Sequence, residues 1–407
     1  MCLGARTSPQ YILTPPSPPP SLRWCSRSSY NAINGVPSCG NALLMTELFK
    51  ETWGLGQHWQ GGAYVQGDCG AMENLYRTYH YAQNMTHAAA IALNAGGDKD
   101  CGSALPGNLV EAIELGYTTE AALDASLTRT YTLQFLAGRF DPMERQPYMG
   151  IPFEAIDSPA NRALAYETGV QGLVLLRNDA GLLPLPRGKR LAVVGPHGNT
   201  TGDLMGNYFE QRCAAGDFSC VVSLVGALQA FGEAPAACVL GCEMNGGDAS
   251  GIPAAVAAAG AAEIVILALG ANGDTAQEGR DRADASFPGH QGDLLTAVLQ
   301  VGKPTVVLLF NGGVFAMDAL KNFTGPSPVA VVECFFPGEA GGTPVVDTIF
   351  GLANRFGKLP VTVYPQSFYD AVPIDQMSMV PIAGVTPVRT ILFSCACARL
   401  CVCVFVR

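Results

Sequence analysis

The chain has few charged residues: 14% of its 407 residues are Asp, Glu, Lys or Arg, and the net charge is −10. No cluster of Lys and Arg interrupts this acidic background, which argues against a surface that follows the phosphates of a nucleic acid. No apolar run is long enough to cross a bilayer, because the stretch 391–406 is short and contains Arg399. We therefore expect neither a nucleic-acid partner nor a membrane partner.

The chain also lacks the residue patterns that bind metals or nucleotides. Its 14 cysteines include no Cys-x-x-Cys pair, and its five histidines show no ligand spacing. Neither a Walker-type loop nor a Gly-x-Gly-x-x-Gly turn follows a candidate strand, which sets aside a nucleotide-binding protein. We expect the cysteines to form structural disulfides or buried thiols. The histidines are expected on the surface or on helices: His58, His80, His87, His197 and His290.

The N-terminal residues lack the long apolar core and the small-residue cleavage site of a signal peptide. They are rich in Ser and Pro instead, so residues 1–28 are expected to form a disordered leader. Three glycosylation sequons, at 84–86, 199–201 and 322–324, nevertheless fit a secreted glycoprotein.

Apolar and turn-forming residues are abundant: 48% of the chain is hydrophobic, and it contains 47 Gly and 28 Pro. This composition is typical of an enzyme with many loops and buried parallel strands. The length predicts two or three domains. The sequence therefore favours an α/β protein of more than one domain.

Residues 29–140 alternate short strands with helices. The apolar run 63–65 predicts a buried strand before Asp68, and Ala95-Gly96-Gly97-Asp98 is expected to close a further short strand. Helical spacing of apolar residues predicts helices at 41–52, 85–93, 107–115 and 119–136. A closed TIM barrel needs eight βα units, and these segments supply roughly three. We therefore predict an incomplete (β/α)8 barrel.

A linker rich in Pro and Gly, 141–157, separates this region from a second one at 158–366. Apolar, β-branched runs predict strands at 172–176, 190–194, 264–269, 304–310 and 329–334. Helices are expected at 161–170, 224–231, 252–261, 291–301 and 341–352. The alternation predicts a largely parallel sheet with helices on both faces, an α/β/α sandwich. Residues 367–407 are expected to form an irregular Cys-rich tail.

Two carboxylates are placed where chemistry is expected. Asp68 follows an apolar strand, and the carboxyl ends of barrel strands carry the active sites of α/β barrels. Glu278 lies in a charged loop after the apolar run 264–270. Two carboxylates on loops are the minimum for cleaving a glycosidic bond, one as nucleophile and one as proton donor. Each has a structural alternative, because an Asp after a strand commonly forms a turn and a loop Glu is commonly solvated.

Several motifs occur in one order along the chain. They are Ser-Tyr-Asn at 29–31, Gly-Asp-Cys-Gly-Ala at 67–71, Asn-Ala-Gly-Gly-Asp at 94–98, Leu-Leu-Arg-Asn at 175–178, Gly-Asn-Tyr at 206–208, Glu-Gly-Arg-Asp-Arg at 278–282, Pro-Gly-Glu-Ala-Gly-Gly at 337–342 and Gly-Lys-Leu-Pro at 357–360. Together they resemble glycoside hydrolase family 3, with the β-xylosidase branch as the closest match. The resemblance runs from about residue 29 to about residue 379.

The resemblance implies a barrel followed by a sandwich, with the active site between them. It assigns Asp68 as nucleophile, Glu278 as acid/base and Tyr30 as a sugar contact, with a position in the barrel core as the alternative for Tyr30. The implied reaction is a retaining double displacement with carboxyl groups about 5 to 5.5 Å apart. The substrate would be an oligosaccharide or aryl glycoside, and no metal or organic cofactor is needed. The implied enzyme is a secreted, exo-acting β-xylosidase, with α-L-arabinofuranosidase or β-glucosidase as further options. The resemblance leaves the oligomeric state open.

The chain departs from the family pattern in two ways. Gly67 stands where family members usually carry Ser, and Gly70 where they often carry Asp. The earlier barrel strands, whose side chains hold the sugar hydroxyls, are not found before Tyr30, and the match stops near Met379. The alternative function is therefore a non-catalytic, truncated family member that folds through its sandwich and binds a sugar or a partner.

Neighbours of the candidate carboxylates are also assigned. Because a cation would make it harder for Glu278 to hold a proton, Arg280 and Arg282 are expected to pair elsewhere. Their expected partners are Asp281, Asp284 or backbone carbonyls. Asp98 and Asp100 are expected to tie down a loop, and Asn207 and Tyr208 to line the cleft or cap a helix.

Overall fold

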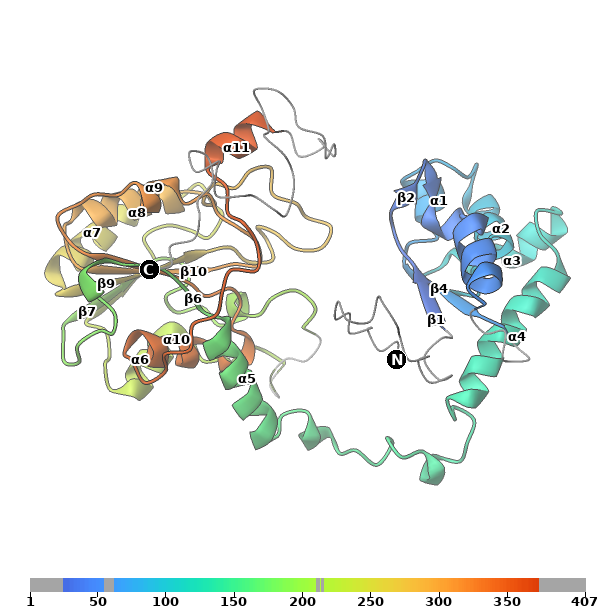
Figure 1. Cartoon of the computed structure of the whole chain (residues 1–407), viewed down its shortest axis with the longest axis horizontal. Helices are drawn as coiled ribbons and strands as arrows, with labels where there is room; N and C mark the ends of the chain where they lie inside the picture. Colours follow the sequence, from blue (N-terminus) through green and yellow to red (C-terminus); the bar gives the residue numbers. More distant parts are fainter. Residues whose placement is uncertain (1–24, 55–61, 210–212, 214–215, 373–407) are drawn as a thin grey trace. The chain divides into compact units, whose positions relative to one another are not determined.

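The computed structural model describes residues 25–54, 62–209, 213 and 216–372 (Figure 1). The chain divides into two compact units, residues 1–152 and 153–407, which we call unit 1 and unit 2. The division falls inside the stretch 141–157 that the sequence predicts as a linker. None of the helices within these described ranges is long and apolar enough to span a membrane.

Unit 1 contains a parallel sheet of β1 (Cys25–Ser28), β4 (Tyr64–Cys69) and β5 (Lys99–Cys101), in the order β1-β4-β5. An antiparallel pair, β2 (Ala32–Ile33) and β3 (Val36–Pro37), lies between β1 and β4 in sequence. The prediction that the leader extends to residue 28 is wrong, because 25–28 pair with β4 along their whole length. Backbone hydrogen bonds order this polar segment, and they leave no apolar signature in the sequence.

The helices of unit 1 pack against this sheet and against one another. The pair Gly96-Gly97 ends helix α2, since its amides bind the carbonyls of Leu93 and Ala92, and strand β5 begins only afterwards. The prediction that 95–98 close a strand is therefore wrong. The helical segments are η3 (Ser38–Gly40), the π-helix η4 (Leu43–Thr52), α1 (Asn74–Arg77), α2 (Met85–Asn94), α3 (Ala104–Glu114), α4 (Glu120–Leu136) and η5 (Met143–Arg145).

Unit 2 is built on a six-stranded sheet in the order β6-β11-β10-β9-β7-β8. Neighbouring strands are parallel except β11 and β6, so the predicted largely parallel sheet is confirmed. All five predicted strands are present, and the sequence missed only the three-residue β8, whose residues are partly exposed. The strands are β6 (Val174–Asn178), β7 (Leu191–Val194), β8 (Ala237–Val239), β9 (Ile264–Gly270), β10 (Thr305–Phe310) and β11 (Val329–Glu333).

Helices cover both faces of this sheet (Figure 1). One face carries α6 (Leu224–Phe231) and α10 (Gly342–Ile349), with α5 (Pro159–Gly172) beside α10; the other carries α7 (Ile252–Ala261), α8 (Gln291–Gln300) and α9 (Asp318–Lys321). The other helical segments are η6 (Phe153–Ala155), η7 (Asp179–Gly181), η8 (Gly202–Leu204), η9 (Gly338–Ala340) and α11 (Gln366–Ala371). Since α11 is helical, the expected irregular tail does not begin at 367; residues 373–407 lie outside the described residues.

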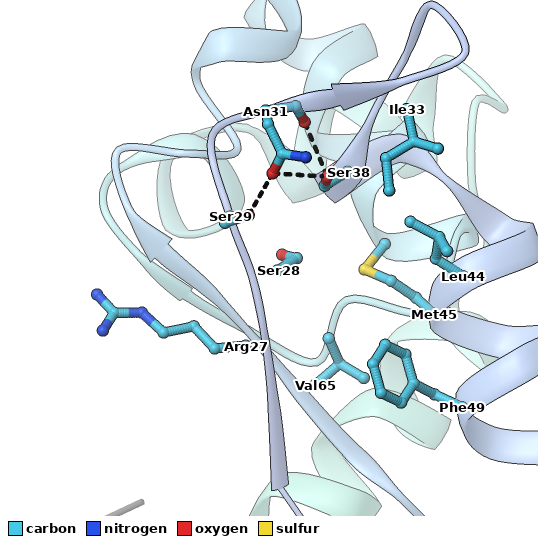
Figure 2. A pocket seen from close by; sticks show the side chains of 10 residues that line it. All are labelled: Arg27, Ser28, Ser29, Asn31, Ile33, Ser38, Leu44, Met45, Phe49 and Val65. Atoms are coloured by element: carbon cyan, nitrogen blue, oxygen red, sulfur yellow. Dashed lines mark hydrogen bonds between the residues drawn. The ribbon is translucent and has the colours of Figure 1, made fainter. Parts of the chain in front are cut away.

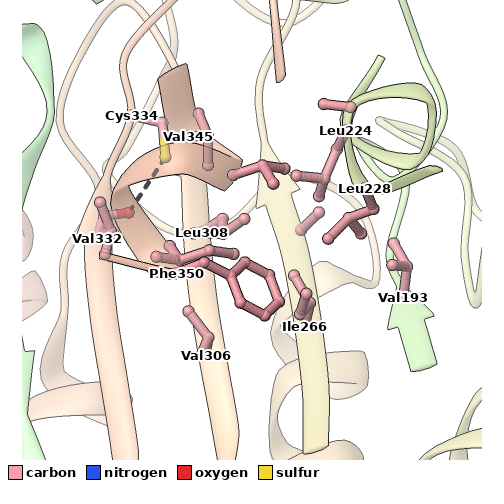
Figure 3. Packing of buried hydrophobic residues seen from close by; sticks show 14 of the residues in the cluster. Val193, Leu224, Leu228, Ile266, Val306, Leu308, Val332, Cys334, Val345 and Phe350 are labelled. Carbon is pink, nitrogen blue, oxygen red and sulfur yellow. Dashed lines mark hydrogen bonds between the residues drawn. The ribbon is translucent and has the colours of Figure 1, made fainter. Parts of the chain in front are cut away.

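The core explains the apolar runs. Alternate residues of β9, β10 and β11 point to opposite faces, and both faces are buried, so most of each strand is an apolar run. Figure 3 shows one face, where Leu224 and Leu228 of α6 and Val345 of α10 lie over Ile266 and Leu308. Burying a side chain of this kind contributes about 1.5 to 3 kcal/mol.

The cysteines of the described residues follow the expectation with one exception. Disulfides join Cys69 to Cys101 and Cys213 to Cys220. Free thiols are buried at Cys39, Cys242 and Cys334, whereas Cys238 is exposed. The cysteines of the C-terminal tail lie outside the described residues.

Candidate active site

Asp68 stands at the carboxyl end of β4, as the sequence predicts. The preceding residues Tyr64 and Val65 are buried, and the Asp68 side chain is 18% exposed. Its Oδ1 accepts a hydrogen bond from the Cys69 amide at 2.7 Å and forms an ion pair with Arg27 of β1. A guanidinium and an amide at one oxygen stabilise the carboxylate anion, which is the form a nucleophile needs.

The backbone that follows Asp68 is held by three contacts. The disulfide joins Cys69 to Cys101 at the end of β5. The Tyr30 hydroxyl donates to the Cys69 carbonyl at 2.7 Å, and the Tyr79 hydroxyl donates to the Tyr30 carbonyl at 2.7 Å. The sequence predicted a sugar contact or a barrel-core position for Tyr30, and it gave no sign that the hydroxyl binds the backbone. These contacts fix the segment that presents Asp68.

Gly67 has a packing explanation. A Cβ added at this position would lie 3.0 Å from two side-chain atoms of Met72. Met72 is fully buried, so it has little room to move away. Serine, which family members usually carry here, would therefore need Met72 to shift.

A pocket of about 240 Å³ lies beside β1 in unit 1. Its polar wall includes Ser28 and Ser29, and its apolar wall includes Met45 and Phe49 of η4. Figure 2 shows the Arg27 side chain pointing away from Met45 and Phe49. Asp68 does not line this pocket, so we do not place the catalytic chemistry there.

Asp98 ties together three elements of unit 1, in agreement with the expectation that it holds a loop. Its side chain is fully buried and accepts from the Val65 amide of β4 at 2.8 Å. It also pairs with Lys50 of η4 at 2.9 Å and with Arg129 of α4 at 2.7 Å. Asp100 accepts from the Leu105 amide at 3.1 Å, and burial raises the pKa of its carboxyl.

Glu278 lies in unit 2, in the loop after β9. Gln277 and Arg280 bridge each other through their backbones, so Glu278 is presented at the tip of a tight turn. Its side chain is exposed, and its Oε2 accepts a hydrogen bond from the Tyr208 hydroxyl. Tyr208 comes from the loop after β7, so two loops of the sheet meet at the candidate acid/base.

The two arginines beside Glu278 bind backbone carbonyls, as predicted. Arg280 donates to the Asp274 carbonyl at 3.0 Å, and Arg282 donates to the carbonyls of Val314 at 2.9 Å and Ser286 at 3.0 Å. The predicted carboxylate partners were wrong in one respect: Arg280 pairs with Asp274, at 3.2 Å. The Arg282 guanidinium also lies 4.5 Å from the centre of the Phe315 ring.

The loops after β7 and β9 meet at the topological switch point of the sheet, where the connections that follow two neighbouring strands run to opposite faces. β7 leads to α6 on one face, and β9 leads to α8 on the other. In open α/β sheets, ligands bind outside the carboxyl ends of the strands at such a switch point. Asn272 of the β9 loop donates to Asp203 of the β7 loop at 3.0 Å, and Thr200 donates to Asp203 at 2.7 Å. These bonds connect the loops that carry Glu278 and Tyr208.

His197 also lies after β7, and the prediction of a surface or helix position is wrong for it. The side chain is completely buried and stacks on Phe310, with ring centres 5.2 Å apart. Burial lowers its pKa to about 4. The turn at Gly195 folds the chain back over β9, since the His197 amide donates to the Ala268 carbonyl at 3.2 Å. Sequence spacing carries no signal of this contact.

Substituting Gly195 with alanine is expected to destabilise unit 2 by about 3 kcal/mol. Gly195 has a φ of 110°, and an added Cβ would lie 2.2 Å from the Ala268 carbonyl oxygen of β9. Urea unfolding followed by far-UV circular dichroism measures the change. Gly188→Ala is the matched control: its φ is 72° but nothing lies within 4 Å of the added Cβ, so it should cost only about 1 kcal/mol. Equal losses in the two variants would contradict the role of the contact with β9.

Comparison with known proteins gives the class of the chain. The glycosyl hydrolase family 3 C-terminal domain matches residues 173–382, and this chain belongs to that family. Among the described residues, no group of three or more His, Cys, Asp or Glu side chains is arranged to hold a metal ion.

Among curated proteins, the chain is similar to fungal proteins named as exo-1,4-β-xylosidases. A probable exo-1,4-β-xylosidase of Neosartorya fischeri is 36% identical over 380 residues, which are 91% of this chain and 47% of the relative. An exo-1,4-β-xylosidase of Emericella nidulans is 37% identical over 358 residues, covering 87% of this chain and 45% of the relative. The chain thus spans about half the length of the curated relatives it matches.

Solved structures agree with this similarity. A family 3 exo-β-xylosidase in complex with a xylobiose aziridine probe matches with a TM-score of 0.78 and 32% identity, covering 88% of this chain and 45% of that one. A β-glucosidase from Listeria innocua in complex with glucose matches with a TM-score of 0.71 and 25% identity, covering 85% and 45%. These structures support the α/β fold with a largely parallel sheet.

Proposed function

We propose that this chain hydrolyses O-glycosyl bonds as a retaining β-glycosidase, with Asp68 as nucleophile and Glu278 as acid/base. The observation that carries the proposal is the placement of Asp68 at the carboxyl end of β4 and of Glu278 in the loop that follows the carboxyl end of β9, in a family 3 chain. Loops beyond the carboxyl ends of parallel strands are where both α/β barrels and open α/β sheets carry their sites.

The proposed reaction has two steps. Asp68 attacks the anomeric carbon while protonated Glu278 gives its proton to the leaving oxygen, so the glycosidic bond breaks and a glycosyl ester forms. Glu278 then takes a proton from water, which attacks the same carbon and breaks the ester. Since Arg27 and the Cys69 amide both bind Oδ1 of Asp68, Oδ2 is the attacking oxygen. Two inversions give net retention.

The proposed substrate is a β-xyloside, either an oligosaccharide cleaved from its end or an aryl glycoside. Support comes from the relatives, which are named exo-1,4-β-xylosidases, and from the structural neighbour bound to a xylobiose probe. We propose Tyr30 as a sugar contact. Its hydroxyl is engaged by the Cys69 carbonyl, so its 36% exposed side chain would meet the sugar through the ring.

We also propose that the protein works in an oxidising, extracellular compartment. Two disulfides among the described residues support this, because disulfides persist outside the cytosol. The three sequons add compositional support. Mass analysis of the protein from its natural source should find glycans and both disulfides; reduced cysteines and no glycan would overturn the proposal.

A second candidate function is sugar or partner binding without turnover. It is favoured by the sheet of unit 1, which has three strands in the described part of the chain, whereas a closed barrel has eight. Groups that hold the sugar hydroxyls strengthen their bonds in the transition state, so their loss would lower turnover more than binding.

The proposed function is tested by trapping the glycosyl ester. The purified full chain is incubated with a 2-deoxy-2-fluoro-β-xylosyl fluoride, which slows the second step, and the digested protein is examined by mass spectrometry. We expect a fluoroxylosyl adduct on Asp68 and none on the Asp68→Asn variant. Asp124→Asn, a substitution of an exposed residue on α4, should label like the unmodified chain.

The outcomes separate the two candidates. An adduct on a different carboxylate would reject Asp68 as nucleophile. Absence of an adduct and of turnover on aryl β-xylosides, together with calorimetric binding of xylobiose, would support the binding function instead. Turnover that survives in Asp68→Asn would also overturn the proposal.

A further inference from the structure

The contact between Tyr208 and Glu278 joins the candidate acid/base to a residue that has no assigned role. The Tyr208 hydroxyl donates to Oε2 of Glu278 across a separation of 70 residues. Both residues belong to unit 2, and Tyr208 is 77% exposed. Core packing therefore does not force the two side chains together. Their contact depends on how the two loops are held.

The backbone of Tyr208 is held in an unusual conformation. Its φ is 62°, in the left-handed region that aromatic residues rarely occupy. Such conformations cost about 1 to 3 kcal/mol and persist where the surroundings impose them, commonly at functional sites. Before Tyr208, Asp203 is bound by Asn272; after it, Phe209 packs edge-on against Phe218 with ring centres 5.2 Å apart. The loop is thus anchored on both sides of Tyr208.

The Glu278 side of the contact is also well defined. The bridge between Gln277 and Arg280 fixes the turn, and Asn272 accepts from the amides of Asp274 at 3.0 Å and Thr275 at 3.2 Å. Hydrogen bonds within the loop that holds Glu278 therefore fix its shape independently of the contact with Tyr208.

Within the described residues, the basic side chains of the Glu278 loop have partners of their own. Arg280 is paired with Asp274, and Arg282 is bound to the carbonyls of Val314 and Ser286. Among the described residues of the β7 loop, Tyr208 contacts Glu278 through its hydroxyl. The hydroxyl is therefore the donor placed to stabilise the anion.

Resting on the proposed function, we propose that Tyr208 is the positioning residue of the acid/base. Its hydroxyl occupies Oε2 of Glu278, so the transferable proton is carried on Oε1. A hydrogen bond donated to a carboxylate favours the ionised form, which is the form that accepts a proton from water in the second step. Tyr208 would thus set both the orientation of Glu278 and the pH at which it changes from acid to base.

The test measures the titration of Glu278 directly. The full chain is labelled with ¹³C at the Glu side-chain carboxyl, and the Glu278 resonance is assigned by its loss in Glu278→Gln. A hydrogen bond donated to a carboxylate favours its ionised form, so Tyr208→Phe should raise the titration midpoint of Glu278 measured in this way. Tyr208→Asn should raise it equally, because Asn tolerates the left-handed conformation but is too short to reach.

Tyr148→Phe is the matched control, since Tyr148 is 80% exposed and lies in unit 1. It should leave the Glu278 midpoint unchanged. An unchanged or lowered midpoint in both Tyr208 variants would overturn the proposal. In an active chain, the alkaline limb of kcat/KM for an aryl xyloside should move upward by the same amount; a limb that stays in place while the midpoint moves would reject the role in catalysis.

This result is separable from the proposed function. The titration does not require turnover, so it reports the Tyr208 contact whether or not the chain labels on Asp68. A shifted midpoint without an adduct on Asp68 would reject the glycosidase and keep the contact. An adduct on Asp68 without a shift of the Glu278 midpoint would keep the glycosidase and reject the role of Tyr208.

Discussion

Replacing Glu333 with glutamine is expected to increase the stability of unit 2 relative to the unmodified chain by an amount that grows above pH 4.5 and reaches about 5 kcal/mol near pH 8. Glu333 lies at the carboxyl end of β11 and is 2% exposed. It accepts hydrogen bonds from the Asn311 side chain at 2.8 Å and the Phe335 amide at 3.2 Å. Burial outweighs these bonds and raises its pKa to about 8.

The sign follows from the protons bound in each state. Above about pH 4.5 the unfolded chain releases the Glu333 proton, whereas the folded chain keeps it up to about pH 8. The free energy of unfolding therefore falls by about 1.4 kcal/mol per pH unit over this range. It stops falling once Glu333 is ionised in the folded chain too. Glutamine does not titrate and retains an acceptor oxygen for Asn311 and Phe335, so this loss disappears in the variant.

His197 acts in the opposite direction. Its pKa of about 4 in the folded chain lies below the ordinary value of 6.5, so the unfolded chain gains a proton first as the pH falls. Stability then decreases from about pH 6.5 to about pH 4. Between pH 4.5 and 6.5 the slopes of His197 and Glu333 oppose each other in the unmodified chain. Glu333→Gln should therefore reveal a rise in stability across that range.

Urea unfolding at a series of pH values measures these slopes. Far-UV circular dichroism follows the secondary structure of both units. Tryptophan fluorescence reports unit 1, because all 3 tryptophans are at positions 24, 53 and 59. Glu154→Gln, a change of an exposed residue in unit 2, is the control and should follow the unmodified chain. A Glu333→Gln variant that keeps the original slope between pH 6.5 and 8 would show that Glu333 is ionised in the folded protein.

Replacing Asp98 with alanine is expected to destabilise unit 1 by about 4 kcal/mol. The substitution leaves Lys50 and Arg129, which are 13% and 21% exposed, without their counter-charge. It also removes the acceptor for the Val65 amide. Burial already lowers the pKa of Lys50, while the Asp98 charge opposes that shift. Removing one partner of a buried ion pair destabilises a protein by more than the net contribution of the intact pair to stability. The reason is that the other charge stays buried and unpaired.

The same fluorescence signal measures this loss in urea. Asp124→Ala on α4 removes an exposed carboxylate and should change the free energy of unfolding of unit 1 by less than about 0.5 kcal/mol. The part of the circular dichroism change that is due to unit 2 should occur at the same urea concentration in the unmodified chain and in both variants. A loss below about 1 kcal/mol in Asp98→Ala would show that Lys50 and Arg129 find other partners or water.

Much of unit 2 could be predicted because its strands are buried on both faces. The runs 264–269, 306–310 and 329–332 within β9, β10 and β11 are apolar, and no turn residue interrupts them. The polar segment 25–28 gave no such signal, so β1 and Arg27 were missed. The sequence also could not show that β6 runs antiparallel to β11, because direction depends on which strands become neighbours.

The candidate site shows the same division. The motifs around Asp68 and Glu278 identify both carboxylates and predict that each follows a strand. They do not predict the ion pair with Arg27, the hydrogen bond from Tyr208 or the burial of His197. Each of these contacts joins residues that are distant in sequence, and no local pattern records such pairings.

The sequence by itself determined the family, the α/β class and the positions of the two carboxylates, because strand burial and short motifs are local properties. Only the tertiary structure decided which groups surround Asp68 and Glu278. Parallel pairing brings Arg27 to Asp68, and the order of β7 and β9 in the sheet brings Tyr208 to Glu278. The protonation of a carboxylate depends on its neighbours in space, so this part of the chemistry follows from the fold.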